Sequence, residues 1–212
     1  MSDSLTNLVV HWVRPEIRAL QAYHVQPAQG LIKLDAMENP YTWPEALRDA
    51  WVELLRSTDV NRYPDPSARA LSERLIDAMQ GPQGLRVLLG NGSDELIQRI
   101  AMSLSGPGRC VLSVDPGFGM CRWIGTFCGM PYVGIPLRAD DFGLDLPAIL
   151  EAMHEHQPAV VFLAYPNNPT ANLFDEQAML DIIRAAPGLV VVDEAYAPFT
   201  DATFMRRLGE FD

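Results

Sequence analysis

Lysine is almost absent from this sequence of 212 residues. Lys33 is the only lysine, and the other 15 of the 16 basic side chains are arginines. Any reaction that needs a lysine amine must therefore use Lys33 or a residue outside this sequence. A lone lysine on a short strand is ordinarily a solvated side chain whose stem covers apolar surface. We therefore expect Lys33 to have no catalytic role.

Cysteine is scarce as well, with Cys110, Cys121 and Cys128 as the three thiols. An odd number without a Cys-x-x-Cys pair argues against a disulfide framework and against a zinc knuckle. We expect all three to be small thiols of the core. His154 and His156 are not at the one-face helical spacing that metal sites favour, so we expect no metal site.

Basic residues are few relative to acidic ones: the sequence has 16 basic and 27 acidic residues, and its net charge is -11. Such a surface repels phosphate backbones and anionic lipid, so neither nucleic acid nor membrane is an expected partner. No apolar run approaches the roughly 20 residues that span a bilayer. The N-terminus is acidic where a secretory signal is basic, so we expect a cytoplasmic protein.

From Gly84 onward, apolar strand patterns alternate with amphipathic helix patterns. We predict strands at 86–89, 110–114, 132–135, 160–164 and 189–192. We predict helices at 93–105, 118–128, 146–154 and 175–186, the third of them capped by Asp145. Strands that are apolar throughout and alternate with helices form a mostly parallel sheet with helices on both faces. The predicted fold class is therefore α/β.

The residues before Gly84 do not show this alternation of strands and helices. They contain helical patterns in the first 30 residues, one of them opened by Arg14-Pro15-Glu16, a strand at 31–34, and helices at 44–56 and 67–80. Two prolines make 61–66 irregular. We expect residues 1–64 to form an N-terminal arm and part of a small domain, and residues 65–212 to form the larger α/β domain.

Unusual residue clusters follow the predicted strands. In parallel α/β sheets, ligands bind outside the carboxyl ends of the strands. Four clusters would meet there, at 90–95, 115–118, 165–170 and 193–196. We therefore expect one ligand crevice at this edge of the sheet.

The cluster at 90–95 is a glycine-rich turn that enters a helix. Its glycines allow close backbone approach, and free amides at a helix start favour an anion such as phosphate. Ser93 would add a hydroxyl donor or simply cap the helix. A dinucleotide site is the rival hypothesis, because Gly90-x-Gly92 matches its first two glycines and Asp115 would be the ribose-binding acid. Glu95 at the third glycine position argues against it.

The other clusters contain candidates for binding an aromatic cofactor. Asp193 follows four apolar residues, so its carboxylate would need a cation such as a protonated pyridine nitrogen, unless it simply faces water. Tyr196 would reach the neighbouring ring oxygen. Asn168 would donate to the same oxygen, although Asn-Pro turns are common without any function. Phe118 would stack on the ring or belong to the core.

Taken together, these residues resemble the fold-type-I aminotransferases that use pyridoxal 5′-phosphate (PLP). The resemblance implies a set of cofactor contacts. Gly92, Ser93 and Asp94 would bind the phosphate, and Phe118 would stack on the ring face. Asn168 and Tyr196 would bind the phenolic oxygen, and Asp193 would bind the ring nitrogen. These residues follow one another in the order of the family.

Two N-terminal stretches, Arg14-Pro15-Glu16-Ile17 and Asn61-Arg62-Tyr63-Pro64-Asp65, are similar to the histidinol-phosphate aminotransferases, as is Glu38-Asn39-Pro40. The resemblance implies a homodimer in which Tyr63 reaches the PLP phosphate of the partner subunit, with Glu38 and Asn39 on the substrate side. The implied reaction exchanges an amino group between glutamate and imidazole-acetol phosphate, which gives 2-oxoglutarate and histidinol phosphate. A related aminotransferase or decarboxylase of aromatic amino acids or threonine phosphate, a nucleotide-binding module, and a catalytically dead interaction protein remain alternatives.

The sequence departs from the family at three places. Ala171 replaces the glycine of Asn-Pro-Thr-Gly, and Met37 replaces an asparagine beside Glu38. The Ser-x-Ser-Lys segment with the Schiff-base lysine, expected shortly beyond Tyr196, is not among these residues, and Lys33 lies in no such context. We therefore expect the chain to correspond to the front portion of the enzyme and to be inactive alone.

Overall fold

A computed structural model describes residues 3–21, 27, 29–32 and 38–211. The chain divides into two units, one formed by Met1–Ala22 with Gly81–Asp212 and the other by Tyr23–Gln80. The domain boundary predicted after residue 64 stays a prediction.

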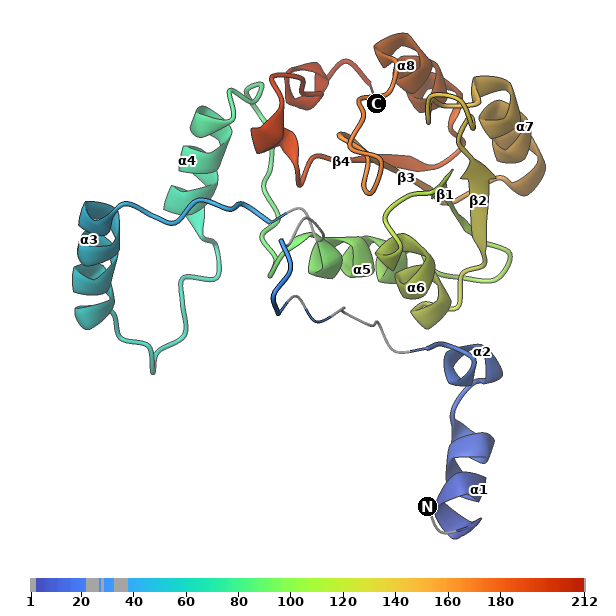
Figure 1. The fold of residues 1–212 in the computed structure, drawn as a ribbon, viewed down its shortest axis with the longest axis horizontal. Helices are drawn as coiled ribbons and strands as arrows, with labels where there is room; N and C mark the ends of the chain where they lie inside the picture. Colours follow the sequence, from blue (N-terminus) through green and yellow to red (C-terminus); the bar gives the residue numbers. More distant parts are fainter. Residues whose placement is uncertain (1–2, 22–26, 28, 33–37, 212) are drawn as a thin grey trace. The chain divides into compact units, whose positions relative to one another are not determined.

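The first unit is built on one parallel sheet (Figure 1). Its four strands are β1 (Val111–Asp115), β2 (Tyr132–Pro136), β3 (Val160–Ala164) and β4 (Leu189–Asp193), in the order β2-β1-β3-β4. The first four residues of both β1 and β3 are buried, because helices cover both faces of the central strands. The predicted α/β class is confirmed.

Two helices cover each face of the sheet. The pair α5 (Ser93–Leu104) and α6 (Met120–Phe127) packs on one face, and the pair α7 (Leu146–His156) and α8 (Glu176–Ala185) packs on the other (Figure 1). The chain therefore leaves β1 and β3, which are neighbours, toward opposite faces. Ligands of α/β proteins bind at such a point, where the strand order reverses.

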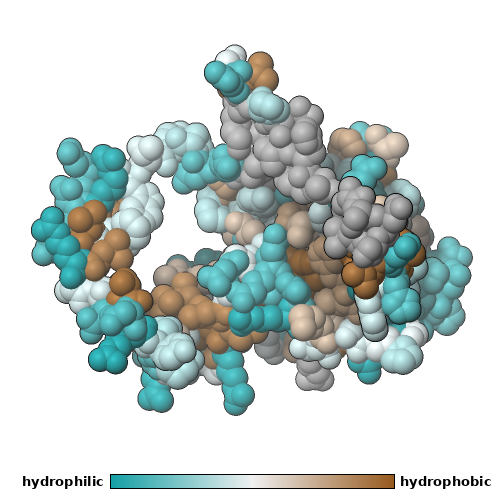
Figure 2. Space-filling model, turned by 90° about the horizontal axis from the view of Figure 1, so that it is seen from below, coloured by the Kyte–Doolittle hydropathy of each residue, from teal (hydrophilic) through white to brown (hydrophobic). Residues whose placement is uncertain are grey.

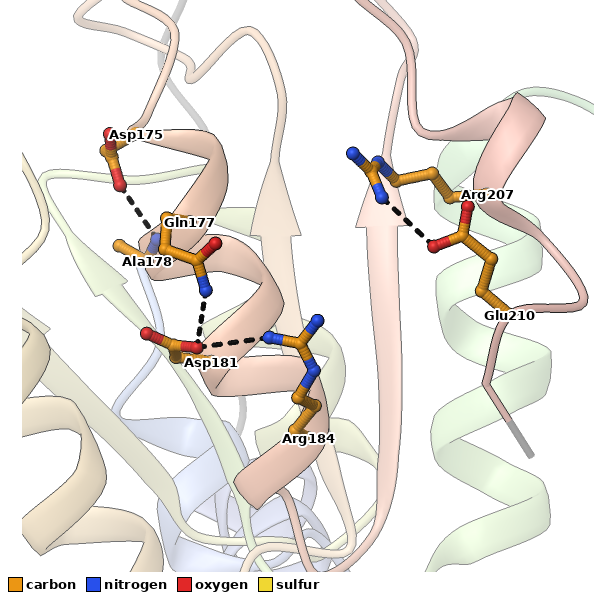
Figure 3. Close-up of polar contacts among 7 residues, drawn as sticks. All are labelled: Asp175, Gln177, Ala178, Asp181, Arg184, Arg207 and Glu210. Carbon is orange, nitrogen blue, oxygen red and sulfur yellow. Dashed lines mark hydrogen bonds and ion pairs between the residues drawn. The ribbon is translucent and has the colours of Figure 1, made fainter.

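Side chains fix the ends of the helices on the α7/α8 face. Asp145 accepts from the Ala148 amide at 3.2 Å, so the predicted cap of α7 is confirmed. Asp175 caps α8 in the same way, accepting from the Ala178 amide at 2.8 Å (Figure 3). These bonds satisfy amides that have no partner inside the helix.

Ion pairs lie on α8 and in the last described residues, and one of them connects the two. Asp181 accepts from Arg184 at 3.2 Å on the surface of α8 (Figure 3). Arg207 donates to Glu210 at 3.0 Å and also to Glu176 in the first turn of α8. The segment after β4, which includes the short 3₁₀ helices η1 (Ala197–Phe199) and η2 (Met205–Arg207), is thereby held against the sheet domain.

The N-terminal helices belong to the same unit. They are α1 (Asp3–Trp12) and α2 (Pro15–Arg18), and the start of α2 at Pro15 confirms the predicted opening. The Arg14 guanidinium donates to the carbonyl oxygens of Thr126 at 3.1 Å and Phe127 at 2.6 Å. A cation on the last carbonyls of a helix is stabilising, so Arg14 caps α6.

The second unit contains α3 (Glu45–Arg56) and α4 (Arg69–Ala78), which confirms both predicted helices. No residue of either helix is buried, and apolar side chains such as Trp51 and Leu54 are about half exposed or more. Figure 2 shows hydrophobic residues among hydrophilic ones on the visible face of the molecule. The segment 61–66 is irregular, as its prolines predict.

Two predicted strands are not confirmed. Residues 86–89 form no strand, and Leu88 is 62% exposed. Strand formation needs a hydrogen-bonded neighbour, and none of the four described strands pairs with this segment. The strand predicted at 31–34 falls partly outside the described residues, as does Lys33. Among the described helices, none has both the length and the apolar character needed to cross a bilayer.

Candidate functional site

Asp193 ends β4 at the carboxyl edge of the sheet, partly buried. Its Oδ1 accepts from the Ala195 amide at 3.0 Å. Burial raises the pKa of this carboxyl, the Ala195 amide opposes that shift, and the negative charge of Asp94 adds to it. A partly desolvated carboxylate of this kind favours a cationic partner.

Asn168 and Tyr196 meet at the same edge. The Asn168 side-chain amide donates to the Tyr196 hydroxyl at 3.4 Å. Their turns follow β3 and β4, which pair directly, with Ala164 opposite Asp193. The pairing of the strands therefore brings an amide, a phenol and a carboxylate together.

The turn after β1 carries Phe118. Its ring packs against the core cluster under α5 and α6 and stays partly exposed. The structure thus places Phe118 at the rim of the core, beside the edge where the other candidates lie. Its stacking role stays a prediction.

The glycine-rich turn opens α5. Gly92 is the N-cap residue at φ +82°, and an added Cβ would meet nothing within 4 Å, so backbone conformation rather than crowding favours glycine. Ser93 is the first helical residue, so the structure does not support the alternative that Ser93 caps the helix. Without a capping side chain, the first amides of α5 are available to an anion.

Glu95 turns back over this loop. Its carboxylate accepts from the Asn91 amide at 2.5 Å and pairs with Arg99 at 2.6 Å. The Asn91 amide lowers the pKa of Glu95, and Arg99 lowers it further. The residue that replaces the third glycine of a dinucleotide fingerprint therefore has a defined structural role.

Asp115, the ribose-binding acid of the rival hypothesis, is also engaged. It pairs with Arg122 at 2.8 Å and accepts from the Tyr132 hydroxyl at 3.2 Å. The Arg122 guanidinium lies over the Tyr132 ring, 4.2 Å from its centre. Burial raises the pKa of Tyr132, and the neighbouring carboxylate raises it further. These contacts disfavour a dinucleotide site.

The three cysteines are free thiols, Cys110 and Cys121 buried and Cys128 partly buried, which confirms the expected core thiols. Burial raises the pKa of Cys121 to about 12, with smaller contributions from Asp193 and then Asp94. Both carboxylates are therefore close enough to act on one buried group. The start of α5 and the end of β4 both lie near this thiol.

Asn167 is a buried polar residue that the sequence patterns did not single out. It is 0% exposed, and its Nδ2 donates to the Pro116 carbonyl at 3.1 Å and to Thr170 Oγ1 at 2.6 Å. Ala171, which replaces the family glycine, keeps the left-handed conformation at φ +59°. Its amide donates to the Asn167 carbonyl at 2.8 Å, which closes the turn.

Comparisons with known proteins show the family of this chain. The family model described as aminotransferase class I and II matches residues 29–208. A histidinol-phosphate aminotransferase of Thiocapsa roseopersicina is 56% identical over 89% of this chain and 100% of its own length. The chain belongs to the histidinol-phosphate aminotransferases of the class I and II family.

Other relatives are longer than this chain. Histidinol-phosphate aminotransferase 2 of Nitrosococcus oceani is 54% identical over 96% of this chain, which spans only 56% of that protein. The structure of histidinol-phosphate aminotransferase from Sinorhizobium meliloti in complex with pyridoxal-5′-phosphate has a TM-score of 0.72 at 24% identity. The match covers 88% of this chain and 51% of the other, and at this identity it shows the shared fold alone.

The remaining candidates of this aminotransferase chain lie in the second unit. Tyr63 is fully exposed. Asn39 Oδ1 accepts from the Tyr41 amide at 3.0 Å, which fixes a local turn, and Glu38 is exposed. The predicted roles of Tyr63, Glu38 and Asn39 stay predictions.

Proposed function

We propose that this chain is the cofactor-binding portion of a PLP-dependent aminotransferase of histidine biosynthesis. The parent enzyme would exchange an amino group between glutamate and imidazole-acetol phosphate, giving 2-oxoglutarate and histidinol phosphate. The relatives' names support this reaction. The observation that carries the proposal is the meeting of Asp193, Asn168 and Tyr196 at the end of two paired strands.

The chemistry of these side chains fits PLP. When bound, PLP supplies an electron sink, and it does so best with its ring nitrogen protonated. Asp193 would hold that proton on the nitrogen, because an ionised partner removes the cost of the buried carboxylate. Burial is the main cause that raises the pKa of Asp193, and no cation among the described residues opposes it.

Asn168 and Tyr196 would bind the phenolic oxygen of the ring. One contributes an amide donor and the other a hydroxyl donor, and they lie 3.4 Å apart. Two donors on one oxygen favour its anionic form and fix the ring about its axis. Phe118 would cover one face of the ring.

The phosphate would bind at the start of α5. The N-cap residue is Gly92, and the helix begins with Ser93 and Asp94. Their amides lie at the positive end of the helix dipole. The Asn91 amide is already bonded to Glu95. We therefore assign the phosphate to the amides of residues 92 to 94 and to the Ser93 hydroxyl.

The parent enzyme is expected to need more than this chain. We propose that it is a cytoplasmic homodimer, in which Tyr63 reaches the phosphate of the partner subunit and Glu38 and Asn39 lie on the substrate side. Residues 1–64 would belong to the arm and small domain, and residues 65–212 to the large domain. Because Lys33 is the only lysine present, the 212-residue chain alone should not catalyse transamination.

A comparison of two polypeptides tests this proposal. The full-length product of the coding DNA and the 212-residue chain are assayed for consumption of 2-oxoglutarate with histidinol phosphate. We expect turnover by the first and none by the second. A full-length product that prefers phenylalanine, tyrosine or threonine phosphate would contradict the substrate assignment, and turnover by the short chain would contradict the requirement for a further lysine.

A further inference from the structure

One buried side chain connects two turns of the proposed site. Asn167 follows β3, and its Nδ2 donates to the carbonyl oxygen of Pro116, 51 residues earlier, in the turn after β1. The chain continues from one turn into α6 and from the other into α8, on opposite faces of the sheet. The hydrogen bond therefore spans the point where the strand order reverses, which is where such sheets bind ligands.

Both ends of this bond adjoin residues assigned to the cofactor. Phe118 lies shortly after Pro116, and Asn168 directly follows Asn167. A change in the separation of the two turns would therefore move the Phe118 ring relative to the Asn168 amide. Asn167 itself is 0% exposed, so it reaches no ligand from solvent and acts through these neighbours.

The orientation of the Asn167 amide is fixed by its surroundings. Both protons of Nδ2 are used, one by Pro116 and the other by Thr170 Oγ1 at 2.6 Å. Reversing the amide would set its oxygen against the Pro116 carbonyl. Oδ1 has no hydrogen-bond partner among the described residues, which costs free energy that an apolar side chain of similar size would avoid. Packing alone therefore does not explain an asparagine at this position.

The connection continues beyond the two turns. Thr170 Oγ1 donates to Asn172 Oδ1 at 2.5 Å, and Asn172 Nδ2 donates to the Phe142 carbonyl at 3.0 Å. The turn after β3 is thus anchored on the loop before α7 as well. Asn167 is the member of this chain of hydrogen bonds that reaches the turn after β1.

We propose that Asn167 is a positioning residue that holds the Phe118 and Asn168 turns together and so sets the affinity of the site for the pyridine ring. The inference about affinity rests on the proposed function. The connection between the turns is testable without any ligand.

The test compares Asn167→Ala with a matched control, Ser113→Ala, in the full 212-residue chain. Ser113 is also buried, at 4% exposure, and its Oγ donates to the Phe162 carbonyl at 2.8 Å. It therefore links the same two strands, but inside the sheet rather than between the turns. A second variant, Asn167→Asp, keeps the side-chain shape while it sets an oxygen against the Pro116 carbonyl.

Hydrogen–deuterium exchange without ligand is measured first. We expect both Asn167 variants to speed exchange about tenfold or more in the segments 116–122 and 166–172, with Ser113→Ala within about twofold of wild type there. Exchange that is unchanged in either segment, or accelerated equally by Ser113→Ala, would overturn the proposed connection.

Binding of pyridoxine 5′-phosphate is then measured by equilibrium dialysis. This probe has the ring, the phenolic oxygen and the phosphate but no aldehyde, so Lys33 cannot capture it. We expect Asn167→Ala to weaken binding about tenfold and Ser113→Ala to leave it within about twofold. An unchanged affinity in Asn167→Ala would overturn the positioning role. Failure of the wild-type chain to bind would instead contradict the proposed function, while hydrogen exchange still decides whether Asn167 joins the turns.

Discussion

The side-chain amide of Asn168 lies 3.4 Å from the hydroxyl oxygen of Tyr196, although 28 residues separate them in the chain. One residue follows β3 and the other follows β4, so the parallel pairing of these strands creates the contact. A hydroxyl can donate to a further acceptor while it accepts from an amide. The pair can therefore direct two donors toward one ring oxygen.

Tyr196→Phe should weaken binding of pyridoxine 5′-phosphate by about tenfold to a hundredfold, because a hydrogen bond to an anionic oxygen is lost. Equilibrium dialysis measures the change. Tyr41→Phe removes a hydroxyl from an 83% exposed ring and is the matched control. Equal losses in the two variants would speak against a ligand contact for Tyr196.

Asp193→Asn should stabilise the chain at neutral pH when no ligand is present. Burial raises the pKa of Asp193 above the ordinary value of 3.8, so ionisation costs more in the folded than in the unfolded chain. This penalty is absent below pH 3.8, grows as pH rises through the raised pKa, and is constant above it. Urea unfolding of both proteins from neutral pH downward should show the advantage of Asp193→Asn shrinking.

The same substitution should have the opposite effect on ligand binding. A charge-assisted hydrogen bond contributes about 1.5–3 kcal/mol, so Asp193→Asn should weaken pyridoxine 5′-phosphate binding about tenfold to a hundredfold at neutral pH. Gain of stability together with loss of affinity is the expected signature. A variant that loses stability at neutral pH would show that the carboxylate is already satisfied by the protein.

Ala171→Gly should stabilise the chain by about 0.5–1 kcal/mol, because Ala171 has a φ of +59° where glycine is less strained. Urea unfolding gives the difference. Ala50→Gly, in the exposed interior of α3, should instead lose about 0.5–1 kcal/mol. Destabilisation by Ala171→Gly would mean that the alanine methyl makes a contact that outweighs the backbone strain.

Gly134→Ala should destabilise the chain by about 1–3 kcal/mol through overpacking. A Cβ at this position in β2 would lie 1.9 Å from Asp115 Oδ2 and 2.7 Å from the Tyr132 ring. The pair of Asp115 with Arg122 would have to move. Thermal melting measures the loss of stability. At Gly119 an added Cβ would meet nothing within 4 Å, so Gly119→Ala is expected to be nearly neutral. Similar melting of the two variants would show that the Asp115 side chain relocates freely.

The sequence predicted the sheet well, because its strands are apolar throughout and each helix pattern is amphipathic. Helix caps such as Asp145 could also be predicted, because a carboxylate directly before the start of a helical pattern is a local sequence signal. The strand prediction at 86–89 was wrong, because a strand needs a hydrogen-bonded neighbour and the local sequence pattern does not show whether one exists. Residues 86–89 have the composition of a strand without a partner in the described sheet.

The site was only partly predictable for a related reason. Asp193 and Asn168 follow apolar stretches, and this position can be recognised in the sequence alone. Asn167 and the pairing of Asp115 with Arg122 depend on which strands are neighbours and on how turns meet. No spacing rule connects Asn167 with Pro116, 51 residues away. An asparagine beside an Asn-Pro turn, shortly after an apolar strand, was the one sequence signal that could have drawn attention to it.

Isothermal titration of pyridoxine 5′-phosphate into the wild-type chain tests most directly whether these residues form a PLP site, with NAD titrated in parallel. The account predicts saturable binding of the pyridoxine phosphate at one site per chain, strongly weakened by Asp193→Asn, and no saturable binding of NAD. Saturable NAD binding, or no binding of pyridoxine phosphate by the folded chain, would contradict it.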